Sequence, residues 1–142
     1  MREIKFRMFD KESGELFTQN QFAVAGNGLI TFAFDELGMG SETNGFAGYE
    51  FVESKDLEEV VLMQYTGLKD KNGVEICEGD VVSYKTVTID DYMEFSVVFD
   101  SAKARFAEQI KGSEFLSDGS FLRSTRKIEV IGTIYQNPEL IK

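Results

Sequence analysis

Apolar residues recur at every second position in several short stretches of the chain, which is the period of β-strands with one buried face. The pattern begins at the N-terminus, where Ile4, Phe6 and Met8 alternate with Glu3 and other charged residues. We therefore predict a first strand over residues 2–9, with these apolar side chains on its buried face.

Further β segments follow at similar spacing along the chain. Residues 16–34 predict two short segments around a Gly-Asn-Gly turn at 26–28. Ser54 is a candidate N-cap for one helical turn that runs into the next strand, and the only proline, Pro138, is expected to end the last strand. The remaining strands are predicted at residues 60–65, 74–76, 81–89, 93–99, 104–110 and 127–135.

The stretch GLKDKNGVEICEGDVV, residues 67–82, gathers four acidic residues around turn signals. Asp, Asn and Gly favour turns because their side chains bond locally or permit positive φ, so we interpret the stretch as a hairpin followed by a second turn. The residues with predicted turn roles are Asp70, Asn72, Gly73, Gly79 and Asp80.

A metal or catalytic role for the acidic residues is the alternative. An EF-hand loop that begins at Asp70 would need Gly at its sixth position, whereas Gly73 stands at the fourth. We assign the Asp90, Asp91 and Glu94 cluster to a solvated loop or strand edge, and Cys77 to the packed interior, because no histidine is available to activate a thiol. The sequence therefore predicts no metal site, cofactor or catalytic residue.

Composition narrows the classes of function further. The 142 residues include 25 acidic and 15 basic residues, a net charge of −10 that disfavours generic nucleic-acid binding. The absence of histidine removes the commonest general base and zinc ligand. The length of 142 residues predicts one compact unit. A single cysteine, a charged N-terminus and no long apolar run lead us to expect this unit in a reducing cytoplasm, with no membrane contact.

Two segments are candidates for interactions. The glycine-rich residues 38–48 show little periodicity and are predicted to form a surface loop that binds a partner, through Gly38, Gly40, Asn44, Gly45 and Phe46. Basic residues are concentrated in residues 101–127, and the candidate basic face consists of Lys103, Arg105, Lys111, Arg123, Arg126 and Lys127.

Three stretches resemble the YopX family of small proteins encoded by phages and prophages of Gram-positive bacteria: MREIKFRMFD, LMQYTGLKDKNGVEICEGDVV and VIGTIYQNPEL. The sequence departs from the family pattern at Phe9, Cys77 and Thr133. The resemblance implies a mainly β fold with minor α content, in which an N-terminal β region, residues 1–58, precedes an SH3-like, partly open barrel at 59–142. It implies no activity.

Three hypotheses about function remain open. The first is a non-catalytic phage or prophage accessory protein that binds an unknown host or phage protein, or a second copy of itself, through β edges and the 38–48 loop. The second is a nucleic-acid-associated SH3-like module that uses the basic face. The third is a metal-dependent hydrolase built from carboxylates alone.

Overall fold

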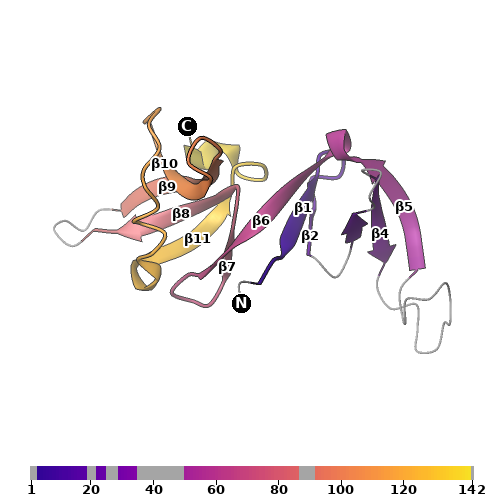
Figure 1. Ribbon diagram of the computed structural model, residues 1–142, viewed down its shortest axis with the longest axis horizontal. Coiled ribbons are helices and arrows are strands. Elements are labelled where there is room, and N and C mark those ends of the chain that lie inside the picture. The colour runs from indigo at the N-terminus through magenta and orange to yellow at the C-terminus, as the bar shows by residue number, and fades with distance from the viewer. Residues whose placement is uncertain (1–2, 19–21, 25–28, 35–49, 87–91, 142) are drawn as a thin grey trace. The chain divides into compact units, whose positions relative to one another are not determined.

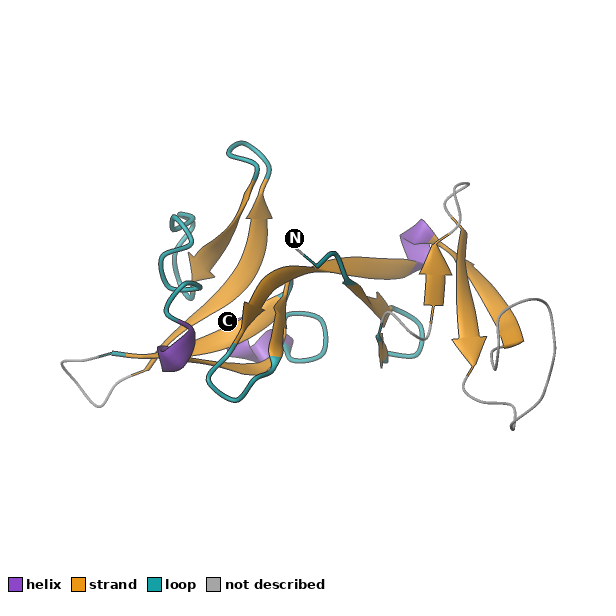
Figure 2. Cartoon of the chain, turned by 60° about the horizontal axis from the view of Figure 1, so that its bottom comes forward, coloured by secondary structure: helices purple, strands orange, loops and turns teal. Residues whose placement is uncertain are grey.

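The computed structural model describes residues 3–18, 22–24, 29–34, 50–86 and 92–141. These residues form eleven β-strands and three short 3-10 turns, so that the fold is mainly β (Figures 1 and 2). The strands are β1 (Phe6–Asp10), β2 (Leu16–Phe17), β3 (Phe22–Val24), β4 (Leu29–Phe34), β5 (Glu50–Asp56), β6 (Val60–Lys69), β7 (Glu75–Cys77), β8 (Asp80–Lys85), β9 (Tyr92–Asp100), β10 (Arg105–Ile110) and β11 (Ile128–Thr133).

The chain divides into two compact units. One unit comprises residues 6–62, and the other comprises residues 1–5 together with 63–142. The division falls inside β6. Residues 1–5 belong with the C-terminal unit because the backbone carbonyl of Lys5 accepts a hydrogen bond from the N–H of Tyr65 at 2.9 Å.

The N-terminal unit contains two sets of antiparallel strands. Strand β1 lies between β2 and β6, and a separate sheet has the order β3-β4-β5. Met8, Phe22 and Val60 form its buried cluster. The predicted first strand is therefore present, but it begins at Phe6, and Ile4 is 65% exposed rather than buried.

The C-terminal unit contains a four-stranded antiparallel sheet in the order β10-β9-β8-β11 (Figure 1). Val82 of β8 pairs with Phe95 of β9 at its centre. The core contains Ile76, Val82, Phe95, Val97, Leu122 and Ile128. One sheet of the protein is curled into a half-barrel, and the prediction of a mainly β fold with a partly open barrel is confirmed.

The short helical segments differ in detail from the prediction. Ser54 lies within strand β5, and the 3-10 turn η2 starts three residues later, at Leu57–Glu59. Pro138 does not end the last strand, since β11 already ends at Thr133 and Pro138 begins the 3-10 turn η4 (Pro138–Ile141). Proline suits a first helical position because its missing N–H is not needed there. No helix of the described residues has the length and apolar character to span a bilayer.

Candidate functional site

Asp70 organises the turn between β6 and β7. Its side chain is buried, and Oδ1 accepts hydrogen bonds from the backbone N–H groups of Asn72 (2.8 Å) and Val74 (2.9 Å). Gly73 completes the turn with φ +81°, a conformation that L side chains rarely adopt. The carboxylate thus holds its own turn by local bonds, as expected of Asp in such positions.

The same carboxylate also covers the outer edge of strand β11. Oδ2 of Asp70 accepts the N–H of Val130 at 3.0 Å, and the N–H of Lys71 donates to the carbonyl of Ile128 at 3.1 Å. An exposed strand edge invites unwanted pairing with another chain. The turn at residues 70–73 therefore closes part of one edge of the four-stranded sheet.

The second turn, at residues 78–80, is part of the packed interior. Asp80 is fully buried, and its Oδ2 accepts the N–H of Cys77 at 2.8 Å. Gly79 has φ +83°, and a Cβ at this position would come within 2.8 Å of Cε2 of Tyr135. Burial, with a smaller contribution from Glu78, raises the pKa of Tyr135. Only glycine fits this turn without displacing the tyrosine ring.

Glu108 was not singled out in the sequence, yet it is fully buried in strand β10. Its carboxylate accepts the N–H groups of Gly119 (2.8 Å) and Leu122 (2.7 Å), and its backbone carbonyl accepts the N–H of Ser117 (2.8 Å). These bonds hold residues 117–122 against the outer edge of β10. The far edge of the sheet is thus partly closed in the same way as the β11 edge.

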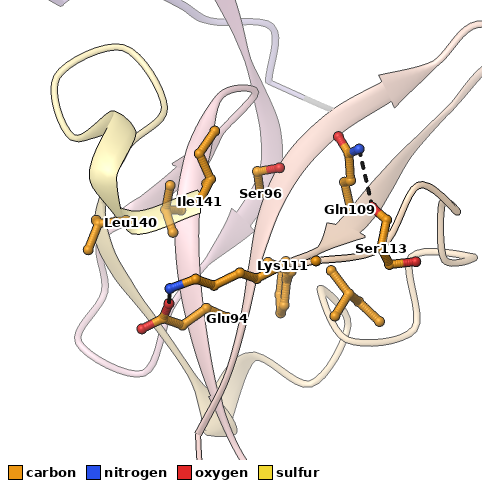
Figure 3. Close-up of a pocket in the computed structure, with 11 residues that line it drawn as sticks. Glu94, Ser96, Gln109, Lys111, Ser113, Leu140 and Ile141 are labelled. Carbon is orange, nitrogen blue, oxygen red and sulfur yellow. Dashed lines mark hydrogen bonds and ion pairs between the residues drawn. The ribbon is translucent and has the colours of Figure 1, made fainter.

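A cavity of about 120 Å³ lies beside the end of β10 (Figure 3). Strands β8, β9 and β10, the residues after β10 and the turn η4 contribute its walls. It is lined by Val81, Glu94, Phe95, Ser96, Gln109, Ile110, Lys111, Gly112, Ser113, Leu140 and Ile141. Its volume is well below the roughly 300–1,000 Å³ of pockets for drug-sized ligands and close to the roughly 150 Å³ that holds one benzene ring.

The charged groups of this cavity are paired with each other. Lys111 Nζ lies 3.1 Å from Oε2 of Glu94, and the backbone N–H of Lys111 donates to the carbonyl of Glu94 at 3.0 Å. Figure 3 shows the Lys111 side chain extending to Glu94 near Leu140 and Ile141 of η4. The pair leaves the cavity with little net charge, so an apolar occupant fits it better than an ion.

Large apolar side chains are exposed around the same cavity. Phe115 is 84% exposed, and its N–H donates to Oγ of Ser113, a cavity residue. Tyr92 is 57% exposed two residues before Glu94, and Leu116 forms a bridge with Gln109. We call Tyr92, Phe115, Leu116 and Ile141, together with the half-buried Leu140, the apolar rim.

All six residues of the predicted basic face lie within the described ranges. Lys111 pairs with Glu94 at the cavity. Hydrogen bonds from Ser120 lower the pKa of Asp118, and the charges of Arg123 and Arg105 lower it further. These two arginines therefore lie near an acidic residue.

The remaining members of that face have different surroundings. Lys103 lies in the turn after β9, where its N–H donates to the carbonyl of Asp100. Arg126 and Lys127 line a groove with Lys71 and Lys85, which the sequence did not suggest as partners. The basic face as one continuous surface stays a prediction.

Other candidates are only partly covered by the described residues. Asp90 and Asp91, and the 38–48 segment with Gly38, Gly40, Asn44, Gly45 and Phe46, lie outside them. Within the described ranges, no group of three His, Cys, Asp or Glu side chains is placed to hold a metal ion. Cys77 is buried.

The sequence profile of the YopX protein family matches residues 5–142. The chain belongs to the YopX family. Its fold is similar to the crystal structure of protein EF1440 from Enterococcus faecalis, with 25% identity and a TM-score of 0.66, and to yopX from Bacillus subtilis, with 19% identity and a TM-score of 0.62. Both similarities cover 100% of each chain. No curated protein matches this chain.

Proposed function

We propose that this YopX-family chain is a non-catalytic accessory protein of phage or prophage origin that binds a host or phage protein in the bacterial cytoplasm. The binding surface is the apolar rim together with the cavity that it borders. The observation that carries the proposal is the combination of a cavity sized for one side chain with exposed large apolar residues around it. Protein interfaces use such pockets for a single anchoring side chain surrounded by residues that exclude water.

The use made of the acidic side chains supports binding rather than catalysis. The buried carboxylates of Asp70, Asp80 and Glu108 each accept backbone N–H groups in turns. Glu94, which lines the cavity, forms an ion pair with Lys111. These groups are engaged in stabilising the fold, and no observation among the described residues favours a carboxylate-based hydrolase.

The route of binding differs from strand addition at β edges. Backbone and carboxylate groups of residues 70–71 occupy part of the outer edge of β11, and residues 116–122 occupy part of the outer edge of β10. Recognition at this sheet therefore falls to side chains rather than to free strand edges.

A pull-down with surface variants tests the proposal. Tagged wild type, Phe115→Asp and Ile141→Asp are compared in nuclease-treated lysate of the bacterium that carries the gene. Val74→Asp is the matched control, because Val74 is 47% exposed on the turn that covers the opposite sheet edge. We expect a stoichiometric protein partner that wild type and Val74→Asp retain and both rim variants lose. Retention by the rim variants would contradict the proposed surface.

Self-association is tested with the same proteins. Light scattering after size-exclusion chromatography reports whether wild type forms a homo-oligomer. If the rim serves a second copy, the mass falls to that of a monomer in both rim variants and stays unchanged in Val74→Asp. A monomeric wild type that also captures no protein would overturn the proposed function.

A further inference from the structure

Four cationic residues from three distant parts of the chain line one groove of about 340 Å³ in the C-terminal unit. We call it the basic groove: Lys71, Lys85, Arg126 and Lys127, with Thr86 as a neutral member. All four cationic residues are exposed. A local positive surface on a chain with a net charge of −10 is unexpected from composition.

The backbone pairing of the sheet explains why these residues meet. Ile128, the first residue of β11, pairs with Tyr84 of β8, and the carbonyl of Ile128 also accepts the N–H of Lys71. Lys127 precedes Ile128 and Lys85 follows Tyr84, so the antiparallel register places them across from each other at one end of the two strands. The 3-10 turn η3 (Thr125–Lys127) adds Arg126.

Within the part of the chain that the structure describes, the basic groove has more positive charge than its acidic neighbours neutralise. Lys71 Nζ lies 3.2 Å from Oε2 of Glu129, in a pair whose side chains are 45% and 44% exposed. Lys85, Arg126 and Lys127 form no ion pair with the acidic residues of the described ranges. Like charges held together destabilise the compact state, and a bound anion would remove that repulsion.

The chemistry of the groove favours phosphate over carboxylate as the ligand. A phosphate monoester carries about −1.5 to −2 charges and three acceptor oxygens, so it neutralises the cluster better than one carboxylate does. Arginine offers a fork of donors to phosphate oxygens, and lysine acts as a point charge. No aromatic side chain is among the residues that line the groove, so the described surface offers no platform for stacking a base.

We propose that the basic groove binds phosphate groups through charge and hydrogen bonds, without reading a base sequence. This site is separate from the apolar rim and does not depend on the function proposed for it. The phosphates come either from a free polyphosphate compound or from a nucleic-acid backbone, and the experiment distinguishes these sources.

The test compares two charge-reversed double variants. Arg126→Glu with Lys127→Glu alters the groove, and Lys103→Glu with Arg123→Glu alters exposed cations that do not line it. Each substitution replaces +1 by −1, so both double variants lower the net charge of −10 by the same four units. Calorimetry with tripolyphosphate and fluorescence anisotropy with a 5′-phosphorylated single-stranded oligonucleotide, both at low salt, measure binding.

We expect the wild type to bind tripolyphosphate, and the groove variant to lose about tenfold or more in affinity while the control loses much less. Oligonucleotide binding with the same variant pattern would identify a nucleic-acid backbone as a source; binding of tripolyphosphate alone would identify a free compound. No binding of either probe to wild type, or equal losses in the two double variants, would overturn the proposal.

Circular dichroism establishes that each variant is folded. If charge reversal prevents folding, Lys85→Gln with Lys127→Gln removes two charges without adding acidic groups. This neutral variant is expected to show a smaller loss of tripolyphosphate affinity in the same direction. Unchanged affinity in a folded neutral variant would also count against the groove.

Discussion

The two outer strands of the C-terminal sheet are covered by the same chemistry but border different surfaces. At β11, the Asp70 carboxylate bonds to the N–H of Val130, and the basic groove lies next to it. At β10, the Glu108 carboxylate holds the N–H groups of Gly119 and Leu122, and the cavity with its apolar rim lies at the strand's end. One edge is bordered by cations and the other by apolar side chains.

This comparison distinguishes groups that the fold needs at a covered strand edge from exposed side chains that are free to differ between the two edges. A buried acceptor for backbone N–H groups is needed wherever a turn is packed onto a strand edge, since an unsatisfied buried N–H costs free energy. The exposed side chains that surround each covered edge have no such requirement. They are therefore the part of each edge where binding properties can differ.

Replacing Asp70 should have the largest effect on stability. Asp70→Ala removes the acceptor for the N–H groups of Asn72, Val74 and Val130. We expect the free energy of unfolding to fall by about 3–5 kcal/mol, because three charge-assisted bonds are lost and the half-buried N–H of Val130 is left without this acceptor. Chemical denaturation measures the loss, and hydrogen exchange at Val130 reports whether the β11 edge opens.

Asp118→Ala is the matched control for the Asp70 variant. Asp118 is an exposed turn aspartate that accepts hydrogen bonds from Ser120, among them one from its N–H at 3.0 Å. A much smaller destabilisation is expected than for Asp70→Ala. Similar losses in the two variants would mean that the turn itself, and not the covered β11 edge, accounts for the effect.

The opposite edge should respond less strongly to Glu108→Gln. The amide keeps one oxygen acceptor but turns an NH2 group toward a backbone N–H that needs an acceptor, so we expect a loss of about 2–3 kcal/mol. Glu114→Gln, at an exposed position, should leave the free energy of unfolding unchanged. Faster hydrogen exchange at Leu122 but not at Val130 would locate the change at β10. Equally faster exchange at both residues would mean that the two edges do not respond independently.

Local chemistry explains why the Asp70 edge was partly predictable from the sequence. The turn at 70–73 depends on bonds two to four residues away, which the Asp-Lys-Asn-Gly stretch encodes directly. The bond from Val130 to Asp70 spans 60 residues, and no local pattern indicates it. The sequence therefore predicted the turn but not the strand edge that the turn covers.

Glu108 and the basic groove were missed for the same reason. In the sequence, Glu108 looks like an ordinary polar residue of a strand. The residues whose N–H groups it accepts lie 11 and 14 positions further along the chain. Lys85 comes beside Lys127 through the register of β8 and β11, and Lys71 through its bond to the carbonyl of Ile128. Counting charges along residues 101–127 therefore omitted two cations, Lys71 and Lys85, that the fold brings beside Arg126 and Lys127.

The smallest effect on stability is expected for a substitution in the basic groove. Lys85→Ala removes one of four exposed cations that repel each other, so the free energy of unfolding should change by no more than about 0.5 kcal/mol, in the stabilising direction. Added salt screens this repulsion, and it should therefore stabilise wild type slightly more than Lys85→Ala. Denaturation at low and high salt measures this difference. A clear destabilisation at low salt would mean that Lys85 stabilises the β11 edge as Asp70 does. The exposed cations of the basic groove would then have a structural role as well.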